Sequence, residues 1–426
     1  MKTIELKGLD EKIYKHTTKE GLDVYVWQNK NLKSTYMSLS VKYGSNHTKF
    51  KVGNKTYEVP KGIAHFLEHV KFNIDKDTTA HDLFLKSGGE ANAYTTFLFT
   101  SYIVFATDKI IENLNILLDY VYTNYFTKQL INKEKGIIVE ESNMGVDNPY
   151  NYLFYNHLKY ILKSSNYRYE ITGLEDDINS ITLEDIELVY NTFYHPKNMF
   201  LIVCGNVNPY EIAKNVDDKL SEINFSEYQN PKIIVPKESK KVVKNYIELE
   251  HNVTNSKLRY ALKIPRNKFS NFTELELRIY LNLLLQINFG STSKLNEELE
   301  QNGLVFYMSY MYYLMDDYVI IFIIADTLYS EEVIKRIANQ FDNLSVNESD
   351  FLRKQHAELA NLILLYDNVL SVNDSIINDI IYFDEILDNE KEIYENLSYD
   401  KICELVNLID KSECSICVLN PKKKQD

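Results

Sequence analysis

The chain has 426 residues, about three times the usual domain size, so two or more domains are expected. Hydrophobic residues make up 45% of it and charged residues 25%, a globular composition that excludes a disordered or collagen-like protein. The net charge of −14 argues against nucleic acid or an anionic membrane surface as the main partner, and the one basic run, Lys422 to Lys424, is typical of a solvated tail.

The first half of the chain alternates short strands with amphipathic helices. Residues 22–27 and 36–43 are rich in β-branched and aromatic residues and predict strands. Helical periodicity predicts helices over 60–73, 79–87, 109–126 and 128–145, with one or two strands between 88 and 107 and a short strand over 200–205.

The second half repeats this plan. It begins with strand-like residues 258–264 and continues with predicted helices over 270–286 and 350–366. Both halves end in a similar sequence segment, residues 201–209 in the first and 415–421 in the second. The polar, Pro-containing segment 226–241 is the best boundary. We therefore predict an α+β protein of two similar domains, residues 1–225 and 242–426 joined by the linker 226–241, each a mainly antiparallel sheet with helices packed on one side.

Targeting and redox features are sparse. The chain has no run of 18 apolar residues and no apolar core of signal-peptide length at its start, so the cytoplasm is the expected location. Its four cysteines are too few for a disulfide scaffold. Cys414 and Cys417 form a C-x-x-C, but their apolar neighbours favour a buried strand over a redox or metal site.

The sequence His65-Phe66-Leu67-Glu68-His69 carries the clearest chemistry. Successive helical residues rotate by about 100°, so Glu68 and His69 lie within about 60° of His65 on the helix surface. Two imidazoles one turn apart can bind a single zinc ion, and the carboxylate reaches the same side. The simpler alternative is two surface histidines near a solvated glutamate. The other histidines, His81 among them, lack partners at ligand spacing and are predicted to be structural or solvated.

A hydrolytic zinc site needs a third protein ligand, and the helix predicted over 128–145 offers one. Glu134 and Glu141 are two turns apart in the middle of its apolar face, whereas Glu140 is about a third of a turn away. The apolar residues of that face are Leu130, Ile131, Ile137 and Ile138.

A carboxylate that faces a core without a partner costs several kcal/mol, so a cation should meet it. Zinc is one candidate. The alternative is a buried salt bridge, for instance with Lys71 or Arg168.

Four segments of the chain share a family resemblance: residues 62–69 with Phe72, residues 88–95, residues 134–141, and residues 193–199 with 205–207. Together they resemble the pitrilysin superfamily of zinc peptidases, which includes insulin-degrading enzyme and the mitochondrial processing peptidases. The resemblance covers most of the chain. Residues 59–64 and 132–138 look most like a short bacterial branch.

The resemblance implies a role for each residue of the site. His65, His69 and Glu141 would hold one Zn²⁺ per chain, in the first domain only, with Glu134 orienting the ligands. Glu68 would take a proton from water and pass it to the leaving amine. The segment Ala91, Asn92 and Ala93 resembles the edge strand to which a peptide substrate adds.

The resulting hypothesis is a zinc endopeptidase that acts on short or unfolded peptides, in peptide maturation or turnover. The alternative is a non-catalytic binding subunit, since relatives in the family serve as scaffolds after losing the zinc helix.

The chain departs from the family pattern in its second half. In self-sufficient members, a segment resembling L-R-E-x-x-G-L-x-Y supplies an Arg and a Tyr that grip the substrate backbone. Here Leu299 and Phe306 occupy those two positions, and Tyr307 is one place further along. Neither Leu nor Phe can donate the required hydrogen bond. The resemblance therefore predicts a heterodimer in which a zinc-less homologous partner supplies this clamp.

Overall fold

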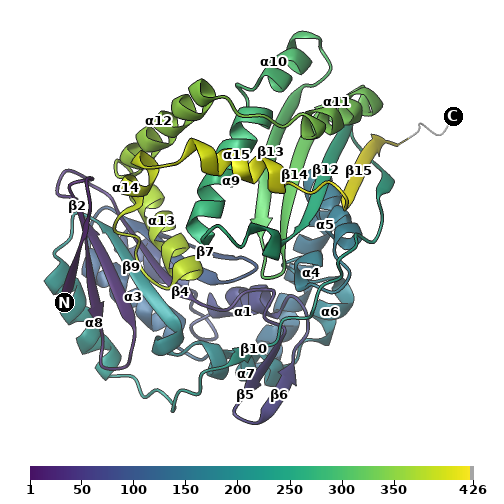
Figure 1. Cartoon of the computed structure of the whole chain (residues 1–426). Coiled ribbons are helices and arrows are strands. Elements are labelled where there is room, and N and C mark those ends of the chain that lie inside the picture. Colours follow the sequence, from purple (N-terminus) through teal and green to yellow (C-terminus); the bar gives the residue numbers. More distant parts are fainter. Residues whose placement is uncertain (423–426) are drawn as a thin grey trace. The chain divides into compact units, whose positions relative to one another are not determined.

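The computed structural model describes residues 1–422, so Lys423 and Lys424 of the basic tail lie outside the described residues (Figure 1). The contacts divide the chain into two compact units. Unit 1 contains residues 1–142, 170–235 and 361–393. Unit 2 contains residues 143–169, 236–360 and, within the described residues, 394–422.

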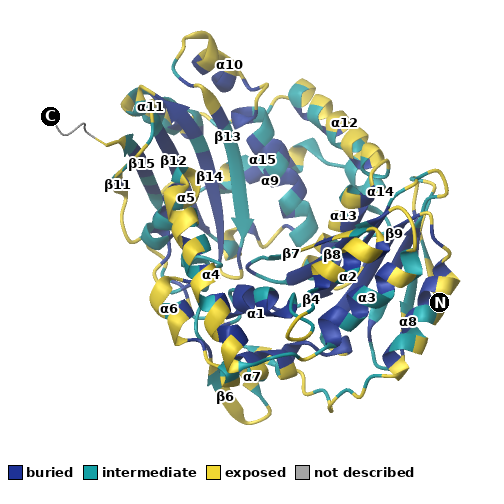
Figure 2. Ribbon diagram, turned by 180° about the vertical axis from the view of Figure 1, so that it is seen from behind, coloured by how far each residue is buried: buried dark blue, intermediate teal, exposed yellow. Residues whose placement is uncertain are grey.

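Unit 1 is built on a seven-stranded sheet in the order β1-β2-β3-β9-β4-β8-β7. Its strands pair antiparallel except for β3 and β9, which are parallel. The strands are β1 (Lys2–Leu6), β2 (Glu11–Thr17), β3 (Asp23–Gln28), β4 (Thr35–Val41), β7 (Gly89–Thr95), β8 (Thr100–Ala106) and β9 (Met199–Gly205). A small second sheet contains β5 (Lys49–Val52), β6 (Lys55–Glu58) and β10 (Lys232–Ile233). Strands β4 and β9 are buried along their whole length (Figure 2).

Most helices of unit 1 cover one face of this sheet. They are α1 (Ile63–Lys71), α2 (Ala80–Ser87), α3 (Ile110–Tyr122), α4 (Lys128–Asp147), α6 (Glu175–Ser180), α7 (Leu183–Phe193) and α8 (Pro209–Ser221). The opposite face packs against α13 (Val369–Phe383), whose buried side chains meet Trp27 of β3 and Phe200 of β9.

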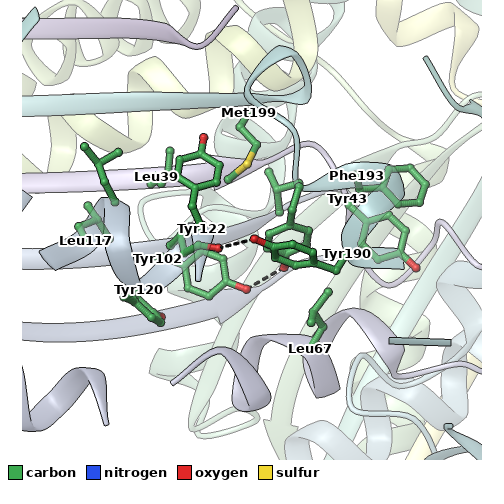
Figure 3. Close-up of a cluster of buried hydrophobic side chains, with 14 of the residues drawn as sticks. Leu39, Tyr43, Leu67, Tyr102, Leu117, Tyr120, Tyr122, Tyr190, Phe193 and Met199 are labelled. Carbon is green, nitrogen blue, oxygen red and sulfur yellow. Dashed lines mark hydrogen bonds between the residues drawn. The ribbon is translucent and has the colours of Figure 1, made fainter. Parts of the chain in front are cut away.

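Aromatic rings from several elements fill the core on the side of α1 (Figure 3). Tyr102 of β8 and Tyr120 of α3 pack edge to face with ring centroids 5.3 Å apart, and the hydroxyls of Tyr102 and Tyr194 are 2.7 Å apart. Leu67 of α1 lies in the same cluster. This packing holds the inner side of α1 firmly against the sheet.

Unit 2 is built on a five-stranded sheet in the order β11-β15-β12-β14-β13. The strands are β11 (Tyr246–His251), β12 (Ser256–Pro265), β13 (Tyr307–Leu314), β14 (Tyr318–Thr327) and β15 (Cys414–Pro421). The helices are α5 (Pro149–Ile161), α9 (Glu274–Phe289), α10 (Lys294–Gln301), α11 (Ser330–Asp342) and α15 (Tyr399–Leu408). Helix α5 packs on one face of the sheet, whereas α11 packs on β12 from the other, where Phe341 stacks on Tyr260. Helices α4, α12 (Glu348–Leu365) and α14 (Glu390–Glu395) run from one unit into the other. Short 3-10 helices occur at Asn166–Arg168, Pro196–Asn198 and Arg266–Phe269.

The two sheets repeat one topology. In unit 1 the order β3-β9-β4-β8-β7 begins with a parallel pair followed by antiparallel pairs, and in unit 2 the order β11-β15-β12-β14-β13 does the same. The two similar sequence segments, 201–209 and 415–421, contribute the matching strands β9 and β15. The predicted fold class, two similar antiparallel-rich α+β domains, is confirmed.

The unit boundaries differ from the predicted ranges 1–225 and 242–426. One change of unit falls at 235/236, inside the predicted linker, but residues 143–169 and 361–393 belong to the unit opposite to the one expected. The reason is packing, because α5 buries Leu153 and Leu158 on the sheet of unit 2 and α13 buries Val372 and Ile376 on that of unit 1. Each sheet thereby has a helix on the side that was expected to be bare.

The structure also bears on two further predictions, the absence of a transmembrane helix and the burial of the C-x-x-C cysteines. Across residues 1–422, no helix is both long and apolar enough to span a bilayer. Cys414 and Cys417 lie on β15, as expected for a buried strand, and burial raises the pKa of the Cys417 thiol to about 12.

Candidate metal centre

Helix α1 carries His65, Glu68 and His69, and two closely packed glycines determine where it begins. Gly62 precedes the helix with φ at 82°, and a Cβ there would lie 2.3 Å from the carbonyl oxygen of Thr172. At Gly173, where φ is 79°, a Cβ would lie 2.8 Å from the carbonyl oxygen of Lys61. Only glycine tolerates both the left-handed backbone and this approach, so the two glycines fix where α1 starts.

Helix α4 supplies the two acidic residues. Glu134 is buried, at 5% exposed, and the side chain of Glu141 is 45% exposed, whereas Glu140 lies off the buried face. The apolar face is narrower than predicted, because Ile137 is 46% exposed while Leu130, Ile131 and Ile138 are buried.

The side chains of α1 and α4 converge on one point. Nε2 of His65 lies 3.5 Å from Oε1 of Glu141, and Nε2 of His69 lies 3.1 Å from Oε2 of Glu141. The potential ligand atoms of these three residues all lie within 4.8 Å of one another. The two imidazole rings have centroids 4.6 Å apart. The structure therefore brings together the three residues predicted to bind zinc.

These donors fit a zinc ion. Tetrahedral zinc with ligands at about 2.0–2.1 Å requires ligand atoms about 3.3 Å from each other, and the two histidine–glutamate separations lie on either side of that value. Two imidazoles and one carboxylate are also the donor set of catalytic zinc sites, which leave a fourth position open.

Glu134 lies behind His69. Its Oε2 is 3.8 Å from Nδ1 of His69, the ring nitrogen that does not face Glu141. A carboxylate that accepts a hydrogen bond from this second nitrogen fixes the orientation and tautomer of a metal-ligating histidine, and Glu134 lies at ion-pair distance from it. The matching nitrogen of His65, Nδ1, is buried and has no hydrogen-bond partner among residues 1–422.

The opposite charges of the histidines and carboxylates stabilise one another in this site, so zinc would have to displace a proton from His69. Burial disfavours the imidazolium of His69, but the nearby carboxylates of Glu134 and Glu141 outweigh it and raise the pKa to about 9. Hydrogen bonds from His65 and His69 hold the pKa of Glu141 well below its usual range.

Glu68 is the candidate base. It is 6% exposed, and burial raises its pKa in spite of the opposing effects of the His65 charge and a hydrogen bond from Thr95. A carboxyl group with a raised pKa is better suited to accept a proton near neutral pH.

A cavity of about 700 Å³ opens over these residues. Besides the metal ligands, Glu68 and Glu134, it is lined by Asn92, Ala93 and Thr95 of β7. Strand β7 is an edge of the seven-stranded sheet, which is what addition of a peptide strand requires. Asn92 and Ala93 are two of the three residues predicted to bind substrate, and the side chain of the third, Ala91, packs in the hydrophobic core beneath the strand.

Two residues of this cavity lay outside the sequence prediction. His81, expected to be structural or solvated, is exposed, as that expectation allows, and it lines the cavity while stacking on Phe72 with centroids 4.7 Å apart. Thr95 had no assigned role, yet its hydroxyl reaches Glu68. The capping box of Thr79 and Asp82, readable in the sequence, places His81 in the first turn of α2.

The ion pairs of Glu134 and Glu141 are with His65 and His69 of α1 and with Lys133, whose Nζ lies 3.9 Å from Oε1 of Glu134. The buried ammonium of Lys71 donates to the carbonyl of Thr123 and lies over the Tyr190 ring, and burial lowers its pKa to about 7. The guanidinium of Arg168 donates to the carbonyl of Lys163.

Two family models match the chain. Residues 24–173 match the insulinase family, peptidase family M16, and residues 180–357 match the peptidase M16 inactive domain.

Several known proteins are similar over most of the chain. The uncharacterized zinc protease YmfH of Bacillus subtilis is 36% identical over 308 residues, which is 72% of either chain. An uncharacterized zinc protease of Rickettsia felis is 26% identical over 95% of this chain and 96% of its own. Among solved structures, an M16-like peptidase from Alicyclobacillus acidocaldarius superimposes with a TM-score of 0.92 at 24% identity, over 98% of this chain and 100% of the other. Pitrilysin gives 0.76 at 15% identity, over 100% of this chain and 47% of the other.

Proposed function

The chain belongs to the insulinase (M16) family of peptidases, and from that membership and the geometry of its metal centre we propose that it is a zinc endopeptidase acting on short or unfolded peptides. The observation that carries the proposal is the convergence of His65, His69 and Glu141 on one point, with Glu68 on the same helix and on the same cavity.

Each residue contributes a separate step. His65, His69 and Glu141 would hold the ion, whose chemistry is to polarise the scissile carbonyl and acidify water. Glu68 accepts the proton of the attacking water and delivers it to the leaving amine. Glu134 keeps His69 in the orientation that presents Nε2.

Strand β7 is the proposed binding edge for the substrate peptide. A peptide that adds to this edge is held through its backbone, which selects extended segments over any single sequence. In the free protein the N–H of Ala93 donates to Oδ1 of Asn92 at 2.9 Å, so an incoming peptide carbonyl would replace that side chain.

We also propose that the enzyme has two subunits and that a zinc-less homologous chain completes the site. At the position where self-sufficient relatives place an arginine, Leu299 of α10 is fully buried in unit 2. At the tyrosine position, Phe306 is 67% exposed and carries no hydroxyl. A partner chain would supply the hydrogen-bond donors that neither residue can provide.

The competing proposal is a non-catalytic binding subunit. It is favoured by the match of residues 180–357 to the inactive domain of the family. The binding subunits of this proposal have lost their zinc helix, whereas here the full set of ligands and Glu68 is assembled within unit 1.

Peptide cleavage tests the proposal. The zinc-loaded protein is incubated with a mixed peptide library, alone and with a co-purified homologous partner, and cuts are mapped by mass spectrometry. We expect cuts that disappear with a chelator and return with added zinc. Stoichiometric zinc without any cut in either condition would favour the binding subunit.

A further inference from the structure

Thr95, the last residue of β7, holds the carboxylate of Glu68. Its hydroxyl Oγ1 donates to Oε2 of Glu68 at 2.5 Å, the length of a hydrogen bond strengthened by charge. Because Glu68 is only 6% exposed, little water competes for this contact.

Thr95 is itself held in place by the neighbouring strand. It pairs with Thr100 across the β7–β8 ladder, and the two Oγ1 atoms are 3.3 Å apart. The fully buried Thr100 donates its own hydroxyl proton to the carbonyl of Tyr43 at 3.0 Å. A β-branched residue also has a restricted χ1. The hydroxyl of Thr95 therefore has a fixed position and a free proton to offer Glu68.

We propose that Thr95 is a positioning residue for catalysis: its hydroxyl fixes Oε2 of Glu68 and leaves Oε1 as the atom that takes the proton from water. A glutamate side chain has three rotatable bonds, and a general base must lie within hydrogen-bond reach of the proton that it abstracts. The inference rests on the proposed function, because it assigns a role within that reaction.

A purely structural role makes a different prediction. If the hydroxyl only tied the β7–β8 hairpin to α1, its loss would disturb the ligands of the same helix and would act whether or not residue 68 is a glutamate. The two roles are therefore separated by zinc content and by the coupling between residues 68 and 95.

The test compares Thr95→Val, which removes the hydroxyl at nearly constant volume, with Thr95→Ser, which retains it. Thr56→Val on β6 is the control, since Thr56 is exposed and far along the chain from this hairpin. Steady-state kinetics are measured with a fluorogenic peptide, in whichever form of the wild type cleaves it, alone or with its partner. Zinc per chain and the thermal midpoint are measured for every variant.

Thr95→Val should lower kcat by about 10- to 100-fold, the effect of losing one hydrogen bond to a charged group, with KM within about threefold. Zinc content should stay at the wild-type value, and Thr95→Ser should remain within about threefold of wild type in kcat. In a Glu68→Gln background, adding Thr95→Val should change the residual rate by less than about twofold.

Three results would overturn the proposal: wild-type kcat in Thr95→Val, loss of zinc in that variant, or an equal fall in rate in the Glu68→Gln background. If Thr95→Val does not fold, failure of Thr95→Ser to retain activity overturns it as well. If the wild type cleaves no peptide in any form, the proposed function fails and this inference falls with it. An active wild type beside an unaffected Thr95→Val refutes only the role of Thr95.

Discussion

Glu140 and Glu141 are neighbours in the sequence with different environments. One step along a helix rotates a side chain by about 100°, so Glu140 lies off the face on which Glu141 meets both imidazoles. Rotation relative to the apolar residues of the helix is enough to distinguish them from the sequence alone. The same reasoning places Glu134, two turns earlier, behind His69.

This arrangement predicts an order of zinc affinities. Glu141→Gln should weaken zinc binding by on the order of 100-fold or more, because an amide is a poor ligand, and Glu134→Gln by about 10- to 100-fold through His69. Glu140→Gln is the matched control and should bind zinc like the wild type. Competition with a chromogenic chelator measures all three. A Glu140→Gln variant weaker than Glu141→Gln would show that the helix faces are assigned wrongly.

Other residues of the site could not be derived from periodicity. Helical spacing predicted Ile137 in the core, yet it is 46% exposed, because the partners of a helix decide how wide its buried stripe is. Thr95 and His81 reach the site from β7 and α2, and their places depend on how these elements pack. Only tertiary structure contains that information.

At the scale of elements, the start of α1 decides whether the metal ligands are presented. Gly62→Ala would force a left-handed backbone on a residue with a Cβ and bring that atom against Thr172. We expect a loss of more than about 2 kcal/mol in stability, together with weaker zinc binding.

Gly136→Ala is the matched control for Gly62→Ala. Gly136 lies inside α4, and a Cβ at this position would have no neighbour within 4 Å, so alanine should stabilise the helix by up to about 1 kcal/mol. Thermal unfolding and zinc titration check both variants. Equal behaviour of the two would show that Gly62 does not lock the helix.

A buried carboxylate joins three segments of unit 2. Glu238 accepts backbone N–H groups of Lys163, Ser164 and Ser165, which follow α5, and the ammonium of Lys263 on β12 at 2.9 Å. Burial raises its pKa, but the hydrogen bonds from Lys163 and Lys263 outweigh this effect and lower the pKa from 4.5 to about 2.

Because the pKa of Glu238 is lower in the folded state, its ionised form stabilises the fold at every pH above its unfolded pKa of about 4.5. This stabilisation is lost as the pH falls from about 4.5 toward about 2. Glu238→Gln should therefore destabilise the protein by about 3 kcal/mol at pH 7, since it leaves Lys263 buried without a counter-charge. The gap to wild type should shrink as pH falls from about 5 toward 2. Thermal unfolding across this range tests it, with the exposed Glu250→Gln as control. A gap that does not change with pH would contradict the assignment.

Most elements were predictable from local sequence, whereas their assignment to units was not. The strands at 200–205 and 258–264 and the helix at 128–145 have strong periodicity and match β9, β12 and α4. An amphipathic helix such as α13 shows which of its faces is apolar but not which sheet that face will cover. That choice depends on the three-dimensional path of the chain. The sequence therefore did not predict that α5 packs on the sheet of unit 2 and α13 on the sheet of unit 1.

At the scale of the whole molecule, the duplicated topology gives only unit 1 a metal centre within residues 1–422. The proposed partner chain leads to a quantitative expectation. The purified chain should cleave peptides slowly, and adding its zinc-less homologue should raise kcat/KM by about 10-fold or more, as expected when two hydrogen bonds to the substrate backbone are restored.

Titration of the partner into a fixed amount of this chain measures that gain. The activity should saturate near one partner per chain, and a partner whose clamp arginine is replaced should fail to activate. A chain that cleaves as fast alone as in any mixture would exclude the two-subunit enzyme.

The central claim, that a zinc ion and Glu68 hydrolyse peptides at this site, is tested most directly by Glu68→Gln. The substitution leaves His65, His69 and Glu141 unchanged, so the variant should bind as much zinc as the wild type while peptide cleavage falls by at least about 100-fold, because only proton transfer is lost. Zinc content and cleavage are measured on the same preparations. Zinc-loaded Glu68→Gln that cleaves peptides at the wild-type rate would contradict the account.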